Sequence, residues 1–335
     1  MDTHFNHTED YTKEEIALRS HFLRQAYPQP DPDKEMADFW ERQERADRKR
    51  QRIVYLSAIL SAAAILCFVF LFFHGKEPKL IVPQGAVVAY KAQTEGDIKD
   101  VTLQKGDEKP QSVGNKLSVV STASHTSTIN TLMTPSSATA EITLSDGTEV
   151  WLNADSKLIY PEHFSNRTRE VTLTGEAYFK VAHDAAHPFI VRTASVSTKV
   201  LGTEFNVKAY KPNDTHITLI EGKVQLSTQH ALCDIIPGED ATFNGKALHV
   251  SEVDTERFTA WRNGDFYFDN ETFLSIAQEI GRWYNVSVVF NDPEKMNTRL
   301  FFAAPKNDGI QDIVEILNSL NKGKVTYHDN QISID

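Results

Sequence analysis

The most apolar stretch of the chain extends from Ile53 to Phe73, and none of its 21 residues is charged. A helix of this length measures about 31 Å at ~1.5 Å per residue, which matches the ~30 Å hydrocarbon core of a bilayer. Cleaved signal peptides lie nearer the N-terminus and have shorter apolar cores. The pattern therefore predicts one transmembrane helix at 53–73.

The segment before this run, residues 1–52, carries two short amphipathic patterns. Thr12 and Glu15 have the spacing of a helix capping box. Between this capping box and the prolines of "YPQPDPD", apolar residues recur at helical spacing at Leu18, Phe22 and Ala26. A second helical pattern begins near Pro32 and contains an apolar patch made of Met36, Phe39 and Trp40.

Two helices of this size cannot bury such a patch well on their own. Two interpretations of the arm follow from the residues alone. In the first interpretation, the arm becomes ordered when its apolar face enters a groove of a cytosolic protein. Alternatively, it forms a helical hairpin that packs on itself or on the lipid headgroups.

After the apolar run, residues 74–133 are rich in Ser, Thr, Gly and Lys, and we expect them to form a stalk or linker. From 134 to 258 short runs of alternating apolar and polar residues predict β-strands. In "AEITLSDGTEVWLN" two such runs flank Asp146-Gly147, which is the strongest short signal for a β-hairpin. Turns are expected at glycines such as Gly175, Gly202 and Gly222. This domain is therefore all-β and solenoid- or sandwich-like, with a barrel as a further alternative.

The period of the pattern changes in residues 259–335, where strand-like and helix-like segments alternate. Asn270 is expected to cap a helix whose apolar face comprises Phe273, Ile276, Ala277 and Ile280. A second helix, ended by Gly323, presents Ile310, Ile313, Val314 and Leu317. The expected order is β-α-β-β-α-β-β, a small α+β domain with both helices on one face of a small sheet.

Charge sets the expected orientation of the span. Two cations follow it, Lys76 and Lys79, whereas six precede it closely: Arg42, Arg45, Arg48, Lys49, Arg50 and Arg52. Positive flanks stay in the cytoplasm, so residues 1–52 are expected in the cytosol and residues 74–335 outside. In a Gram-negative bacterium this is a single-pass protein of the inner membrane whose C-terminal part lies in the periplasm.

The remaining charges exclude one class of partner. The net charge is −11, and residues 1–52 hold ten basic and twelve acidic side chains, so the arm lacks the basic excess of a nucleic-acid binder. Cys67 lies in the expected span and Cys233 outside it, so the two cannot form a disulfide within one chain.

A search for catalytic and binding residues gives no convincing site. None of the phosphate-binding, nucleophile-elbow or zinc-protease motifs is present. His183 and His187 fall between strands, where their spacing does not favour a metal site, and Glu221 has no partner carboxylate. Two interpretations fit the aromatic residues of this domain: a sugar-binding platform or ordinary core packing. These residues are Trp151, Tyr160, Phe164, Tyr178 and Phe179. The sequence therefore predicts neither an enzyme nor a metal or cofactor site.

Two narrower possibilities concern cleavage of the chain. If the turn at Gly202-Thr203 is strained, the Thr203 hydroxyl could attack the Gly202 carbonyl and split the chain; the alternative is a plain strand-end turn. Within the apolar run, Ser57, Ser61 and Ala62–Ala64 would ease local unwinding for an intramembrane protease. The same small residues also suit helix pairing or an ordinary span.

Several motifs resemble a known family. "DGTEVWLN", "GEAYFKV" and "VLGTEFNV" follow in this order within roughly Thr134 to Ser227, as in the central domain of FecR-type anti-sigma factors, especially those of Bacteroidetes. The tail from "WRNGDFYFDNETFLSIAQEIGRWYNVSVVF" onward is similar to the C-terminal domain of that family, a relative of the secretin/TonB short N-terminal fold.

The resemblance implies a role in cell-surface signalling. A TonB-dependent outer-membrane transporter would contact the periplasmic part through its signalling domain, and the cytosolic arm would hold an extracytoplasmic-function sigma factor until membrane proteases release it. On this basis we expect the sigma factor to contact Met36, Phe39, Trp40 and Phe22. The alternative from another class is a membrane-tethered periplasmic module that binds glycans without regulating a sigma factor.

Overall fold

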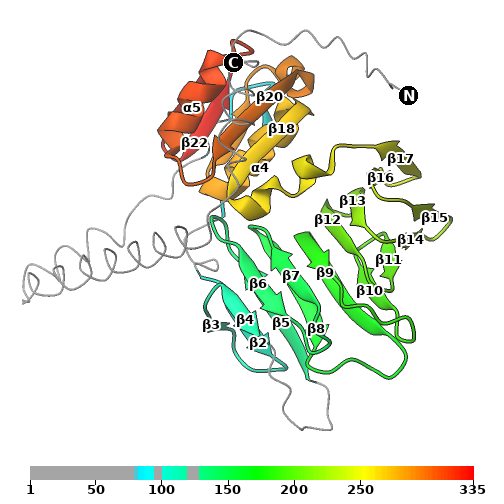
Figure 1. Cartoon of the computed structure of the whole chain (residues 1–335). Helices are drawn as coiled ribbons and strands as arrows, with labels where there is room; N and C mark the ends of the chain where they lie inside the picture. The colour runs from blue at the N-terminus through cyan, green and yellow to red at the C-terminus, as the bar shows by residue number, and fades with distance from the viewer. Residues whose placement is uncertain (1–79, 81, 94–99, 119–127) are drawn as a thin grey trace, which may run out of the picture. The chain divides into compact units, whose positions relative to one another are not determined.

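The computed structural model of the chain describes residue 80 and residues 82–93, 100–118 and 128–335. Within these residues the fold is mostly β, with two α-helices near the C-terminus (Figure 1). None of the described helices is both long and apolar enough to cross a membrane. The expected span at 53–73 lies outside the described residues and stays a prediction.

The larger part of the fold, which we call the β subdomain (residues 100–252), consists of two sheets that share one strand. In the first sheet, neighbouring strands follow the order β3 (Gln111–Ser112), β2 (Thr102–Lys105), β5 (Ile129–Thr134), β8 (Ser156–Pro161), β9 (Arg169–Lys180), β10 (Phe189–Arg192), β11 (Ser197–Val200), β14 (Val224–Ser227) and β15 (Leu232–Ile235). In the second, the order is β4 (Lys116–Ser118), β6 (Ala140–Thr143), β7 (Glu149–Leu152), β9, β12 (Glu204–Lys211), β13 (Asp214–Glu221), β16 (Glu239–Phe243) and β17 (Leu248–Glu252).

The shared strand β9 changes sheets at Gly175. Its first half pairs with β8 and β10, and its second half pairs with β7 and β12. Gly175 has φ +105°, and a Cβ there would lie 2.3 Å from the hydroxyl oxygen of Ser156. The expected turn at Gly175 is therefore wrong: this glycine lies inside a strand, where it permits a bend and a close approach of two backbones.

The two sheets enclose a single apolar core. Leu158 and Val191 of the first sheet belong to the same buried cluster as Val150, Phe179 and Phe205 of the second. Phe179 and Phe205 stack with ring centroids 5.2 Å apart. Among the architectures left open by the sequence, the β subdomain is thus a two-layered, sandwich-like one.

Residues 265–335 form a smaller α+β unit, which together with β1 (Val87–Tyr90) we call the C-terminal subdomain. Two short 3₁₀ segments, η1 (Thr255–Phe258) and η2 (Ala260–Asn263), precede it. Its other elements are β18 (Asp265–Thr272), α4 (Phe273–Tyr284), β19 (Ser287–Phe290), the 3₁₀ segment η3 (Pro293–Asn297), β20 (Arg299–Pro305), α5 (Ile310–Ser319), β21 (Val325–His328) and β22 (Gln331–Ile334).

The C-terminal subdomain has two sheets where one was expected. One sheet has the order β1-β19-β22-β21, whereas β18 and β20 pair only with each other. Helix α4 contacts strands of both sheets, and its buried residues Ile276 and Ile280 share a core with Phe302 and Val288. Helix α4 thus packs against both sheets and contributes to one core that they share.

Both helices occupy the predicted segments, but their ends differ from the prediction. Strand β18 continues through Asn270, and the N-cap of α4 is Thr272, whose hydroxyl accepts a hydrogen bond from the Ser275 amide at 3.2 Å. Helix α5 ends at Ser319 rather than at Gly323. Asn321, with φ +56°, supplies the left-handed residue that was expected from the glycine.

The expected stalk at 74–133 contains strands. β1 joins the C-terminal subdomain, and β2 to β5 join the first and second sheets of the β subdomain. These strands have two to six residues and many polar side chains, so their composition resembles that of a linker.

Candidate functional site

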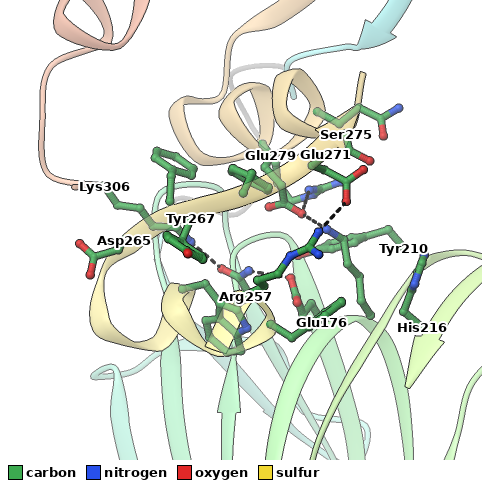
Figure 2. Close-up of a pocket in the computed structure, with 18 of the residues that line it drawn as sticks. Glu176, Tyr210, His216, Arg257, Asp265, Tyr267, Glu271, Ser275, Glu279 and Lys306 are labelled. Atoms are coloured by element: carbon green, nitrogen blue, oxygen red, sulfur yellow. Dashed lines mark hydrogen bonds and ion pairs between the residues drawn. The ribbon is translucent and has the colours of Figure 1, made fainter. Parts of the chain in front are cut away.

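A pocket of about 180 Å³ lies where the two subdomains meet. Strands β12 and β13 of the β subdomain, segments η1 and η2, and elements β18 and α4 of the C-terminal subdomain supply its walls. Figure 2 shows Glu279 above and Glu176 below the pocket, with Tyr210 on one side and Tyr267 and Lys306 on the other.

The centre of the site is a buried ion cluster around Glu279. Helical spacing places Glu279 and Arg282 on the same face of α4, and the Arg282 Nη1 lies 3.0 Å from the Glu279 Oε1. The Nζ of Lys208, on β12, lies 2.6 Å from the same oxygen. Burial alone would raise the pKa of Glu279, but the charges of Lys208 and Arg282 outweigh it and lower the pKa to about 2. Glu279 is therefore ionised and ties the two subdomains together.

A second buried carboxylate, Glu176 on β9, is held by amides. Its Oε2 accepts from Asn153 Nδ2 at 2.9 Å, and its Oε1 accepts from Asn206 Nδ2 at 3.0 Å. Both amides also bind groups beyond β9: the Nε1 of Trp261 in η2 donates to Asn206 Oδ1 at 3.3 Å, and Lys306 Nζ donates to Asn153 Oδ1 at 3.3 Å.

Aromatic rings hold three cations of the site. The guanidinium carbon of Arg282 lies 3.6 Å from the ring centroid of Tyr210. The Nζ of Lys306 lies 4.6 Å from the Trp283 ring, and burial lowers the pKa of this lysine. Arg262, in η2, lies 4.2 Å from the Trp151 ring and 3.8 Å from the Tyr178 ring. Such desolvated cation–π contacts stabilise by up to ~2 kcal/mol each.

His216 forms part of the pocket wall on β13. Its Nε2 lies 3.3 Å from Asp214 Oδ1, and its Nδ1 lies 3.2 Å from Asp240 Oδ2. Burial alone would lower the pKa of His216, but the hydrogen bonds with the two carboxylates outweigh it and raise the pKa to about 9. The imidazole is therefore a cation at neutral pH.

The arrangement is suited to cohesion between the subdomains. Glu279 is ion-paired with Lys208 and Arg282, and Asp155 lies 3.9 Å from Arg282. Glu176 is held by the amides of Asn153 and Asn206. Within the described part of the chain, no group of His, Cys, Asp and Glu has the geometry of a metal site.

Two stretches of the chain match known protein families. Residues 130–225 match the family described as FecR protein, and residues 265–334 match the family described as FecR, C-terminal. The chain belongs to the FecR family.

Solved structures agree with this assignment. A crystal structure at 1.65 Å of a protein from Parabacteroides distasonis ATCC 8503, proposed to be an anti-sigma factor, is 27% identical to the FecR-family chain, with a TM-score of 0.57. The match covers 61% of this chain and 98% of that one. A second structure described in the same words, at 2.50 Å, matches with the same identity and TM-score over 62% of this chain. Among curated proteins, none matches the sequence.

Most of the predicted site residues of this FecR-family chain lie outside the described residues. These are the expected sigma-factor contacts and the small residues of the apolar run: Met36, Phe39, Trp40, Phe22, Ser57, Ser61 and Ala62. Their roles stay predictions.

The structure describes Gly202 and Thr203, which link β11 to β12. Thr203 is buried, and its hydroxyl donates to the Lys223 carbonyl at 3.0 Å. Neither residue has a positive φ. A Cβ at Gly202 would lie 2.8 Å from the Cα of His183, so close packing explains the glycine without backbone strain. Self-cleavage stays a prediction, and a fragment ending at Gly202 would be its signature.

The aromatic residues that were weighed as a sugar platform do not form one. Tyr160, Tyr178 and Phe179 are at most 3% exposed, and Phe164 packs on the buried Phe189. Trp151 lies under Arg262. They are core and junction residues.

Sequence reasoning missed the ion cluster. Glu279 and Arg282 have helical i, i+3 spacing beside the apolar face of α4, which is the only local signal for it among the described residues. Their partner Lys208 lies on a distant strand, and no motif connects the two segments.

Proposed function

We propose that this FecR-family chain is an anti-sigma factor. The match to the Parabacteroides protein proposed to be an anti-sigma factor carries this proposal, because it covers 98% of that protein and 61% of this chain. The partner is an extracytoplasmic-function sigma factor, which docks on the cytosolic arm. Its contacts are the apolar residues Met36, Phe39, Trp40 and Phe22.

The arm and the folded unit lie on opposite sides of the inner membrane in this proposal. The apolar run at 53–73 and the six cations before it support a single span with a cytosolic N-terminus. The described subdomains then lie in the periplasm, where the signalling domain of a TonB-dependent outer-membrane transporter reaches them. Family resemblance supports both the transporter and the release of the sigma factor by regulated proteolysis. One helix has no second helix to slide against, so cutting the chain is a more robust relay than a small tilt.

Capture of the sigma factor tests the function. The full chain is solubilised from membranes together with the small sigma factor expected from a neighbouring gene, and the amount of co-purified sigma factor is measured. We expect the wild-type chain to capture the sigma factor and Trp40→Ala to bind it about 30-fold more weakly, since loss of a buried aromatic anchor costs ~2 kcal/mol. Gln43→Ala, a polar change in the same arm, is the matched control.

Two results would count against this account. If the wild-type chain captures no sigma factor, the anti-sigma function is wrong. If Trp40→Ala captures as much as Gln43→Ala, the function stands but the contact patch is wrong.

A further inference from the structure

Strand β1 joins the beginning of the described chain to its C-terminal subdomain. Val87–Tyr90 pair antiparallel with β19, with Val87 opposite Phe290 and Val88 opposite Val289. β1 lies at the end of its sheet, so its outer edge has no strand partner within the described residues. The described segment that follows the predicted span thus ends in the same sheet as the last strand of the protein.

Side chains of the C-terminal subdomain hold this segment, residues 87–93, which we call the strap. Gln278 Nε2, on α4, donates to the Ala89 carbonyl at 3.1 Å. At the end of the strap, the Gln93 amide donates to Asn285 Oδ1 at 2.8 Å. The Ala92 amide donates to Ser287 Oγ at 3.1 Å. The strap is therefore positioned by a few specific contacts rather than by a long ladder.

The strap also contacts the β subdomain. Gln93 Nε2 donates to Asp155 Oδ1 at 2.7 Å. The other carboxylate oxygen of Asp155 faces Arg282 Nε at 3.9 Å, so the strap is connected to the ion cluster. A movement between the two subdomains would pull on Gln93 from both sides.

The pairing of β1 is weak for a structural strand. It has four residues, its register is broken between Val88 and Tyr90, and Val87 and Val88 are 37% and 38% exposed. An edge strand of this length contributes little to stability and is open to exchange with another extended chain. Tyr90 is closely fitted: it lies against Gly281, where an added Cβ would be 2.8 Å from the tyrosine Cδ1.

We propose that the strap is exchangeable and that the edge of β19 beneath it is a docking site for an extended strand of the periplasmic partner; this rests on the proposed function. The strap itself defines what the edge accepts. The incoming segment pairs antiparallel with β19, carries small apolar side chains opposite Phe290 and Val289, and places an aromatic ring in the space beside Gly281. Exchange leaves residues 87–93 as an unpaired chain between the predicted span and the β subdomain in sequence.

A disulfide lock tests the exchange in the full chain. In a Cys67→Ser, Cys233→Ser background, Val88→Cys with Val289→Cys places two thiols on directly opposed strand residues, a separation that a disulfide spans. The probe is a labelled synthetic peptide with the sequence of residues 85–93, GAVVAYKAQ. We expect the reduced protein to bind the peptide, and tryptic cleavage after Lys91 to become faster as it binds. The oxidised protein should lose both.

A matched lock controls for the effect of the disulfide itself. Thr326→Cys with Ser333→Cys joins β21 to β22 at the opposite side of the same sheet. Oxidation of this pair should change neither peptide binding nor cleavage after Lys91.

A second variant loosens the strap without a disulfide. Gly281→Ala pushes against Tyr90 and against Val288 Cγ2 at 2.9 Å, while alanine favours helix α4 itself. We expect faster cleavage after Lys91 and weaker peptide binding, because the tyrosine of the peptide needs the same space beside residue 281, with an unchanged helical circular dichroism signal.

The proposal is overturned if the oxidised Val88/Val289 lock binds the peptide as well as the reduced protein does. Disulfide-linked dimers in place of the internal bridge would also overturn it, since the edge would then serve a second copy of the chain. Sigma-factor capture is measured on the same preparations. If capture is intact and the lock has no effect, only the strap proposal fails; if capture is absent, the proposed function fails.

Discussion

At the scale of single residues, the ion cluster at the junction decides how firmly the subdomains are held together. Glu279 and Arg282 are each 7% exposed, and each is paired with a charge of opposite sign. A buried pair of this kind adds little net stability over an apolar pair of the same shape, but removal of one partner leaves an uncompensated charge. The cluster therefore favours one arrangement of the two subdomains over others.

Glu279→Gln should lower the free energy of unfolding of the purified protein by ~3–5 kcal/mol at pH 7, because Lys208 and Arg282 lose their shared partner. Glu315→Gln, an exposed change on α5, is the matched control and should leave it unchanged. Urea denaturation followed by tryptophan fluorescence measures both.

The pH dependence of the same residue gives an independent result. The pKa of Glu279 is lowered from 4.5 to about 2 in the folded protein. Its stabilising contribution is therefore complete above pH 4.5 and is lost as the pH falls towards 2. Wild type should lose stability more steeply than Glu279→Gln over this interval. Equal slopes would show that the carboxylate is not held ionised by its neighbours.

The ion cluster was not predicted because its residues lie far apart in the sequence. Lys208 alternates with apolar residues on β12 as any exposed lysine would, and only the packing of α4 against that strand turns it into a buried partner. The buried aromatic residues show the same limit. Tyr160 and Phe179 were compatible with a binding surface or a core, and burial alone distinguishes the two.

At the scale of elements, local patterns predicted well and long-range pairings did not. The Asp146-Gly147 hairpin forms as expected, with Ile142 opposite Val150, because both strands and the turn lie within 13 residues. The apolar faces of α4 and α5 were also correctly predicted from their helical spacing. By contrast, the pairing of β1 with β19 joins segments almost 200 residues apart, and no sequence period records it.

Gly175 allows strand β9 to pass from the first sheet to the second. Gly175→Ala should destabilise the protein severely, by ~3 kcal/mol or more, since the new methyl group would lie 2.6 Å from backbone and side-chain atoms of Ser156 in addition to its strained φ. Gly147→Ala is the matched control. It has a similarly positive φ of +85° but has its nearest neighbour at 4.0 Å, so it should cost only ~1–2 kcal/mol. Thermal unfolding compares the two; equal losses would contradict the close approach at the sheet crossing.

At the scale of the whole molecule, we propose different functions for the N-terminal arm and for the described unit. The described unit, residues 82–335, has two cores and a charged junction, and it offers an exchangeable edge strand near its N-terminal end. The arm that we propose to bind the sigma factor precedes the apolar run. In the proposed relay the membrane lies between the two.

Protease treatment of intact spheroplasts tests this arrangement most directly, with one epitope tag at each end of the full chain. We expect the C-terminal tag and the described unit to be digested while the N-terminal tag and residues 1–52 stay protected until the membrane is opened with detergent. If the N-terminal tag is digested and the C-terminal unit survives in intact spheroplasts, the orientation is reversed and the proposed relay is wrong.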